Sequence, residues 1–258
     1  MKKLLAILVI ILCSIFSDKE IRSEIKTIKI QYFSFRPHIF IDETNNKPAG
    51  ALYNLIENYI APEMGIKFEW DDNTSFVSRQ LENFKSGKEI ASAVLAYSSE
   101  RAQFVGFTQK PYFYDKPAIA VLKDNKLKEV KSIDDIINMT FGYADQYYIS
   151  PFMKNDKIKF DMLHVDDFQE TNLKKLIAKR IDAAYSGGNS ILLYLIKQMN
   201  IENDIKVLNL PEKSVPYYIA FPKDMQDIIS RYNKAFDKLD ARNLYLKLLG
   251  KYLDVSKL

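Results

Sequence analysis

Residues 81–113 read LENFKSGKEIASAVLAYSSERAQFVGFTQKPYF, and the fold prediction rests on the order of patterns in this stretch. An amphipathic pattern over residues 77–84 predicts a helix, and Gly87 is placed to end it. The apolar run at residues 90–96 follows, which is typical of a strand buried on both faces of a sheet. Helices that alternate with buried strands indicate an α/β fold with largely parallel sheets.

The same alternation continues toward both ends of the chain. Apolar or alternating runs predict strands at residues 25–33, 66–70, 104–107, 119–122, 140–143, 158–163, 181–185, 207–210 and 216–221. Amphipathic runs predict helices at residues 50–60, 168–178, 190–199, 225–239 and 242–252. Ser132 is placed to cap a further helix with two aspartates in its first turn. The chain has 258 residues, enough for two modest domains, yet no linker rich in glycine and serine divides it.

The composition excludes several classes of protein. Hydrophobic residues make up 47% and charged residues 27% of the chain, which are globular values and not those of a disordered or multi-span membrane chain. A net charge of +4 is too dilute over this length to indicate nucleic-acid binding. His38 and His164 lie far apart, and the single cysteine, Cys13, allows neither an internal disulfide nor a C-x-x-C motif. We therefore expect no metal and no cofactor.

Residues 1–17 predict a secretory signal peptide. Lys2 and Lys3 precede an apolar run at residues 4–16, which is shorter than the alternative, an N-terminal membrane anchor, would require. Cleavage is expected after residue 17 or as late as residue 23. Cys13 follows large apolar residues where lipoprotein signals carry small ones, and its lipidation stays open. The mature protein is therefore expected in the periplasm.

Several short motifs stand in a defined order along the chain. They are FRPHIF at residues 35–40, SSERA at 98–102, VGFTQKPY at 105–112, SIDDI at 132–136 and LIAKRIDA at 176–183. Their order and spacing resemble those of the bacterial extracellular solute-binding proteins of family 3, which serve the uptake of polar amino acids. The resemblance implies a two-lobed α/β fold of the type II periplasmic-binding-protein class, in which two mixed or parallel sheets flanked by helices are joined by two crossover strands.

The resemblance also implies how the chain divides. The first lobe is expected to contain residues 24–113 together with residues 217–258, and the second lobe residues 114–216. Both ends of the chain then build the first lobe, which accounts for the missing linker. In proteins of this class a ligand binds in the cleft between the lobes, and the lobes close around it.

Arg101 is the strongest candidate for ligand binding. It matches the family's carboxylate-binding arginine, and Ser98 or Ser99 can cap a short helix that brings its guanidinium to the cleft. The alternative is an ordinary surface arginine. Other candidates are aromatic or lie in segments that match ligand motifs: Phe35, Tyr97, Asp145, Gln146, Tyr147, Tyr185 and Gly187, with Tyr32, Phe33 and Tyr112 as further possible cleft walls.

The candidate site departs from the family at the position of the amino group. Gly187 stands where the resemblance places the aspartate that binds an α-ammonium. Because a buried ammonium needs a counter-charge, Asp145 or Asp115 would have to substitute if the ligand is an ordinary amino acid. His38 and Asp42 follow the first predicted strand and are candidates for polar groups of the cleft, but a solvated loop is the favoured interpretation.

The sequence therefore predicts a non-enzymatic periplasmic protein that captures a small carboxylate-bearing solute, either amino-acid-like or an organic acid, by hinge closure. The expected partner is an ABC permease in the inner membrane, and the expected state is a monomer. Two alternatives stay open. One is a periplasmic enzyme on the same fold, similar to a cyclohexadienyl dehydratase, and the other is a ligand-sensing module that docks on a membrane receptor.

Overall fold

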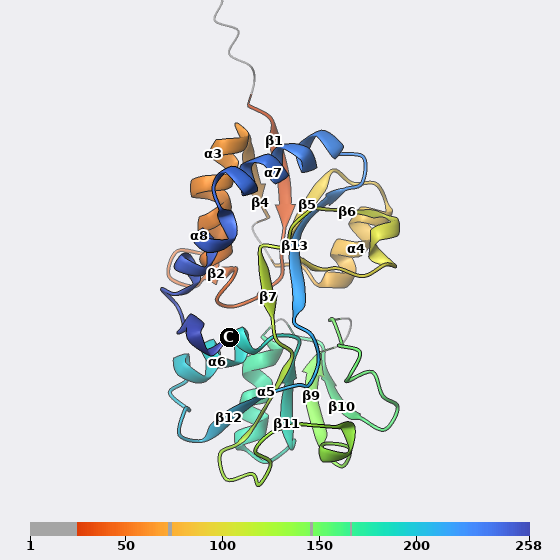
Figure 1. Ribbon diagram of the computed structural model, residues 1–258, viewed down its shortest axis with the longest axis vertical. Coiled ribbons are helices and arrows are strands. Elements are labelled where there is room, and N and C mark those ends of the chain that lie inside the picture. The colour runs from red at the N-terminus through yellow and green to blue at the C-terminus, as the bar shows by residue number, and fades with distance from the viewer. Residues whose placement is uncertain (1–24, 72–73, 145–146, 166) are drawn as a thin grey trace, which may run out of the picture.

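The computed structural model describes residues 25–71, 74–144, 147–165 and 167–258, so the predicted signal peptide lies outside the described residues. The chain forms two α/β lobes, one above the other in Figure 1, and passes between them in extended segments. The first lobe, at the top of Figure 1, contains the first strands of the chain and also its last two long helices, so both ends of the chain build this lobe. The predicted two-lobed fold with mixed sheets is confirmed.

A mixed sheet of six strands forms the centre of the first lobe. Its strands are β1 (Thr27–Gln31), β4 (Lys67–Trp70), β5 (Ile90–Ala96), β6 (Val105–Phe107), β7 (Phe113–Asp115) and β13 (Val215–Pro222). Their order is β4-β1-β5-β13-β6, and β7 also pairs with β13. β1 runs parallel to β4 and β5, whereas β13 runs antiparallel to β5, β6 and β7. The C-terminal part of the chain therefore completes a sheet that the N-terminal part begins.

Helices and a small hairpin surround this first sheet. They are β2 (Phe40–Asp42), β3 (Lys47–Ala49), α2 (Ala51–Leu55), α3 (Ala61–Met64), α4 (Val77–Lys85), α7 (Gln226–Lys238) and α8 (Ala241–Leu249). A π-helical turn, Ile56–Ile60, joins α2 and α3 into one helical segment, which Gly65 ends in the left-handed conformation. Gly50 precedes this segment with φ of 117°, and a Cβ atom there would lie 2.5 Å from the His38 carbonyl oxygen. Only glycine fits that position.

The second lobe contains a sheet of five strands. They are β8 (Ala118–Leu122), β9 (Thr140–Ala144), β10 (Lys159–Leu163), β11 (Ala183–Ser186) and β12 (Ile205–Asn209), in the order β10-β9-β11-β8-β12. β9 runs parallel to β10 and β11, whereas β8 is antiparallel to its neighbours. Helices α5 (Phe168–Ile177) and α6 (Asn189–Gln198) follow β10 and β11, so their N-termini lie near the carboxyl ends of those strands. Ligands of open α/β sheets bind at this edge.

The helix predicted after Ser132 is shorter than expected. Ser132 caps only a single 3-10 turn, Ile133–Asp135, in which the Asp135 carboxylate accepts a hydrogen bond from the Ser132 N–H at 2.9 Å. The cap forms as predicted, but β9 begins at Thr140 and leaves no room for further helical turns. The predicted lobe boundaries, after residues 113 and 216, fall within β7 and β13 and stay a prediction.

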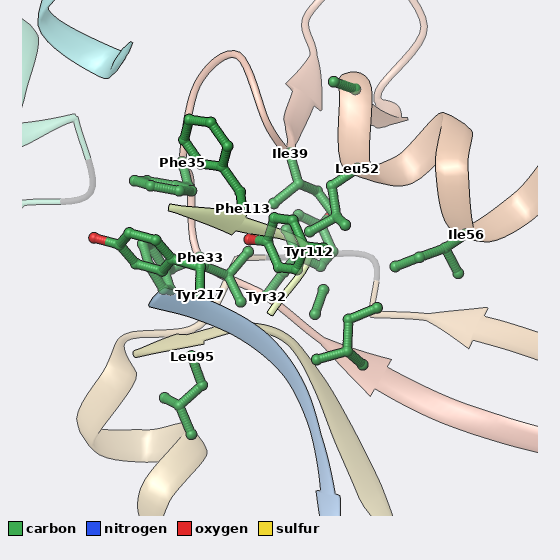
Figure 2. Close-up of a cluster of buried hydrophobic side chains, with 14 of the residues drawn as sticks. Tyr32, Phe33, Phe35, Ile39, Leu52, Ile56, Leu95, Tyr112, Phe113 and Tyr217 are labelled. Carbon is green, nitrogen blue, oxygen red and sulfur yellow. The ribbon is translucent and has the colours of Figure 1, made fainter. Parts of the chain in front are cut away.

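Most of the aromatic residues lie in the hydrophobic cores. Figure 2 shows part of the core of the first lobe, where Tyr32 and Tyr112 are buried beside Ile39 and Leu52. These two tyrosines therefore belong to the core and do not form a cleft wall. Among the residues that the structure describes, no helix is both long enough and apolar enough to cross a membrane.

Candidate functional site

A cavity lies between the two lobes. It encloses about 500 Å³ of empty space, a volume that includes space open to solvent. The first lobe contributes the segment after β1, the end of β5, and β13, and the second lobe contributes β9, the start of α5 and the segment after β11. The lining includes seven aromatic residues, which are Phe33, Phe35, Tyr143, Tyr147, Tyr148, Phe168 and Tyr217.

Arg101 is the only cationic side chain in the described lining of this cavity. It begins a 3-10 turn after β5, where its backbone N–H donates to Ser98 Oγ at 3.2 Å and its Nη1 donates to the Ala96 carbonyl oxygen at 2.8 Å. Burial lowers the pKa of Arg101, whereas the neighbouring Tyr217 and Glu100 raise it. An arginine stays charged under such conditions, so the cavity holds a positively charged and partly desolvated guanidinium.

Six aromatic rings form a continuous series along the cavity wall, which we call the aromatic belt. Its successive contacts are Tyr217–Phe35, Phe35–Phe33, Phe33–Tyr147, Tyr147–Phe168 and Phe168–Tyr143, with ring centroids between 4.6 and 5.7 Å apart. The first three rings belong to the first lobe and lie together in Figure 2, and the other three belong to the second lobe. The contact between Phe33 and Tyr147 therefore joins the lobes across the cavity.

Gln169 is a buried polar group in the lining, in the first turn of α5. Its side chain is 5% exposed, and its Nε2 donates to the Tyr185 carbonyl oxygen at 3.2 Å. Because that carbonyl can only accept, the amide nitrogen must face it. The Oε1 atom is buried and has no hydrogen-bond partner among the described residues.

Asp115 is a buried carboxylate behind the cavity wall. Its Oδ1 accepts from the backbone N–H groups of Lys116 at 2.9 Å and Ser190 at 3.2 Å, and its Oδ2 accepts from the Ser190 hydroxyl. Burial raises the pKa of Asp115 to about 6, although these hydrogen bonds oppose the increase. A Cβ atom on Gly188 would lie almost on top of Oδ2, so the carboxylate packs directly against that glycine.

His38 continues this arrangement into the first lobe, and its placement corrects the prediction of a solvated loop. It is fully buried, with Nε2 2.7 Å from Ser190 Oγ and Nδ1 hydrogen-bonded to the Tyr245 hydroxyl. Burial lowers the pKa of His38 to about 3, so the ring is neutral. Since the Ser190 hydroxyl donates to Asp115, His38 Nε2 must donate to Ser190 and Nδ1 must accept from Tyr245. These four side chains form one directed network, which joins α6 of the second lobe to the first lobe.

The structure brings together some of the residues predicted for the site. Phe35, Arg101, Tyr147 and Gly187 line the cavity. Ser98 supports Arg101 from outside the lining.

Other predicted residues lie elsewhere. Tyr97 is 48% exposed and packs against Phe107 and Tyr218 on the surface of the first lobe, and Ser99 is exposed. Tyr185 lies behind the lining, and its hydroxyl accepts from the Ser150 N–H at 2.9 Å. Asp145 and Gln146 lie outside the described residues.

Several lining residues were missed by the sequence analysis. Phe168, Gln169 and Tyr217 occupy positions that read as ordinary helix and strand residues. The sequence did contain a signal for Phe168 and Gln169, because they begin a helix after a parallel strand, and such a helix start lies at the ligand-binding edge of the sheet.

The fold and cavity define a class of protein. Two α/β lobes with a cavity between them, crossed by two connecting strands, are the architecture of periplasmic binding proteins of type II. The sequence profile of the bacterial extracellular solute-binding proteins, family 3, matches residues 30–255, and the chain belongs to this family. No curated protein sequence matches the chain.

Solved structures of similar fold include ligand-binding and sensor proteins. An ancestral arginine-binding protein bound to arginine shares 25% identity with a TM-score of 0.72, over 88% of this chain and 98% of that one. A histidine kinase sensor domain with similarity to periplasmic binding proteins shares 20% identity with a TM-score of 0.74, over 90% of this chain and 98% of that one. The holo arginine-binding protein of T. maritima shares 20% identity with a TM-score of 0.68, over 83% and 90% of the two chains.

Proposed function

We propose that this protein captures a small carboxylate-bearing solute between its lobes and holds it as the lobes close. The observation that carries the proposal is Arg101, a partly desolvated guanidinium in the cavity that makes no salt bridge within the described part of the chain. A planar guanidinium binds a carboxylate through parallel hydrogen bonds. The solute is amino-acid-like or an organic acid, and the arginine bound to the similar ancestral protein is one such carboxylate.

We also propose that the protein works in the periplasm, as a monomer, and delivers its solute to an ABC permease. Membership of an extracellular solute-binding family and the signal-peptide pattern at residues 1–17 support this location. Expression of the full chain with a C-terminal tag in a Gram-negative host tests it. The processed protein should appear in the periplasmic fraction, and accumulation of unprocessed chain in the cytoplasm would contradict the proposal.

The proposed activity is binding without turnover. General acid–base catalysis needs titratable groups at the substrate, but His38 and Asp115 both bond to Ser190 behind the cavity wall. Conversion of a cyclic acid similar to prephenate by the purified protein would favour the enzyme instead. Retention of the protein by a membrane receptor only in the presence of ligand would favour the sensor.

A thermal-shift screen of amino acids, organic acids and small peptides tests the proposal. A ligand that binds only the folded state adds about 2.7 kcal/mol of stability at a hundred times its dissociation constant, which is readily detected. Calorimetry then compares Arg101→Ala with Arg79→Ala, which removes an exposed arginine from α4. Loss of one partner of a buried charge pair costs about 2–5 kcal/mol, roughly 30-fold or more in affinity. Unchanged affinity in Arg101→Ala would show that the carboxylate binds elsewhere.

A further inference from the structure

We infer that the cavity takes a monocarboxylate with a flat apolar body and no free ammonium group, whose second polar group is an uncharged hydrogen-bond donor received by Gln169. The inference rests on the proposed function, because Arg101 is taken to bind the carboxylate. It goes further by naming the class of ligand. Three features of the cavity carry it: its charge, its orphaned acceptor and its aromatic belt.

The charge of the cavity opposes an ammonium group. Within the described lining Arg101 is the only charged side chain, and no acidic residue is present. An α-amino acid whose carboxylate lies on Arg101 would place its ammonium next to the same guanidinium. Burying an ammonium without a counter-charge is strongly unfavourable, and a neighbouring cation of like sign adds to that cost.

Asp115 is a buried carboxylate behind the cavity wall, and it already accepts three hydrogen bonds. Its two oxygens accept from Lys116 N, Ser190 N and Ser190 Oγ, and Gly188 lies between it and the cavity. The side chain is 1% exposed. An ammonium group in the cavity could therefore approach Asp115 only if the lobe-joining network were broken.

Gln169 offers what an uncharged donor needs. Its Nε2 is held by the Tyr185 carbonyl oxygen, and its buried Oε1 has no partner within the described residues. A buried acceptor without a partner is unfavourable, so a ligand O–H or N–H that reaches it removes an existing penalty. A neutral amide acceptor suits a neutral donor, because it supplies no charge to balance an ammonium.

The aromatic belt determines the body of the ligand. Rings from both lobes contact one another at 4.6–5.7 Å along the wall, and they favour stacking and edge-to-face contact with a flat apolar group. A hydroxylated aryl-alkanoic acid combines such a body with one carboxylate and one neutral donor.

The test uses matched pairs of probes that differ only in the amino group. They are 3-phenylpropionate against L-phenylalanine, 5-guanidinopentanoate against L-arginine, and 4-carbamoylbutanoate against L-glutamine, measured by calorimetry at pH 7. We expect 3-phenylpropionate to bind at least tenfold more tightly than L-phenylalanine. At least one of the 2-, 3- and 4-hydroxyphenyl derivatives of 3-phenylpropionate should bind several-fold more tightly still, and Gln169→Met should abolish that additional gain.

Gly187 allows a gain-of-function test with a matched control. It lines the cavity, and a Cβ atom there would lie 3.4 Å from Tyr217 Oη and 3.5 Å from the Tyr148 carbonyl oxygen, which are ordinary contacts. Gly187→Asp adds a carboxylate to the cavity, and Gly187→Asn adds the same shape without the charge. Gly187→Asp should increase the affinity for L-phenylalanine relative to 3-phenylpropionate at least tenfold, whereas Gly187→Asn should not.

The outcomes separate this inference from the proposed function. If an amino acid binds the wild-type protein more tightly than its desamino partner, and Arg101→Ala abolishes that binding, the proposed function stands and the inference is overturned. If no carboxylate binds, or binding ignores Arg101, both are overturned. The inference is supported if the wild-type protein binds the desamino acid more tightly than the amino acid and Gly187→Asp reverses this preference.

Discussion

Ser190→Ala tests the hydrogen-bond network that joins the lobes behind the cavity. Ser190 is fully buried in the first turn of α6. Its hydroxyl donates to Asp115 Oδ2 and accepts from His38 Nε2 at 2.7 Å. Alanine is a good helix former, so the substitution leaves the helix and removes only the hydroxyl. His38 Nε2 and Asp115 Oδ2 then each lose a hydrogen-bond partner while they stay buried.

The size of the effect follows from these two losses. A buried polar group without its partner costs about 1–3 kcal/mol, and a charged group costs more. Asp115 keeps the backbone donors of Lys116 and Ser190, at 2.9 and 3.2 Å, which limits the cost at the carboxylate. We therefore expect the free energy of unfolding at pH 7 to fall by about 3–4 kcal/mol, a large share of the stability of an ordinary domain.

Urea unfolding followed by circular dichroism measures this difference. Ser86→Ala is the matched control, because Ser86 is exposed and its hydroxyl donates only to the Asn83 carbonyl oxygen at 3.0 Å. The control should lose no more than about 0.5 kcal/mol. If Ser190→Ala were as mild as the control, with an unchanged denaturant slope, the four side chains would not form the network described here.

Three further predictions concern pH, backbone geometry and the cavity wall. Burial raises the pKa of Asp115 from 3.8 to about 6, so its contribution to stability is fully present below pH 3.8 and is lost as the pH rises through 6. The free energy of unfolding of wild type should therefore fall by roughly 2.4 kcal/mol relative to that of Asp115→Asn between pH 4 and pH 7 in urea unfolding, and parallel pH profiles would contradict this. Gly50→Ala should lower stability by about 3 kcal/mol or more, because φ is 117° and the added Cβ would lie 2.5 Å from a backbone oxygen; an unchanged melting temperature would disprove the clash. Phe33→Ala should weaken binding of the carboxylate found in the screen about tenfold or more, whereas Tyr97→Ala, on the surface, should change that affinity less than about twofold. If calorimetry showed the larger effect for Tyr97→Ala, Tyr97 would belong to the binding site.

Much of the fold could be predicted because its signals are local. The buried strand β5, the amphipathic helix α4 and the end of that helix at Gly87 each depend on residues within a few positions of one another. The prediction failed in length after Ser132, where a correct cap is followed too soon by the next strand. Local patterns identify where an element begins more reliably than how far the surrounding structure lets it continue.

The site was predictable only where it shares a short segment with a recognisable motif. Arg101 was found because SSERA stands at a characteristic place between two strands. Gln169 was not found, because a glutamine in the first turn of a helix carries no local mark of its role. That role depends on the Tyr185 carbonyl oxygen, which holds one end of the amide and leaves the other end without a partner.

By itself the sequence determined the order of helices and strands, the two-lobed class of fold and the presence of an arginine at the cleft. Only the tertiary structure decided which polar groups remain available to a ligand. His38 meets Ser190 and Tyr245, which lie 152 and 207 residues away in the chain, and this makes a residue of an apparent loop part of a buried network. The Asp115 carboxylate is likewise hydrogen-bonded to Ser190, which lies far from it in the chain. The physical reason is that secondary structure follows from neighbouring residues, whereas hydrogen-bond satisfaction depends on which distant groups the packed lobes bring together.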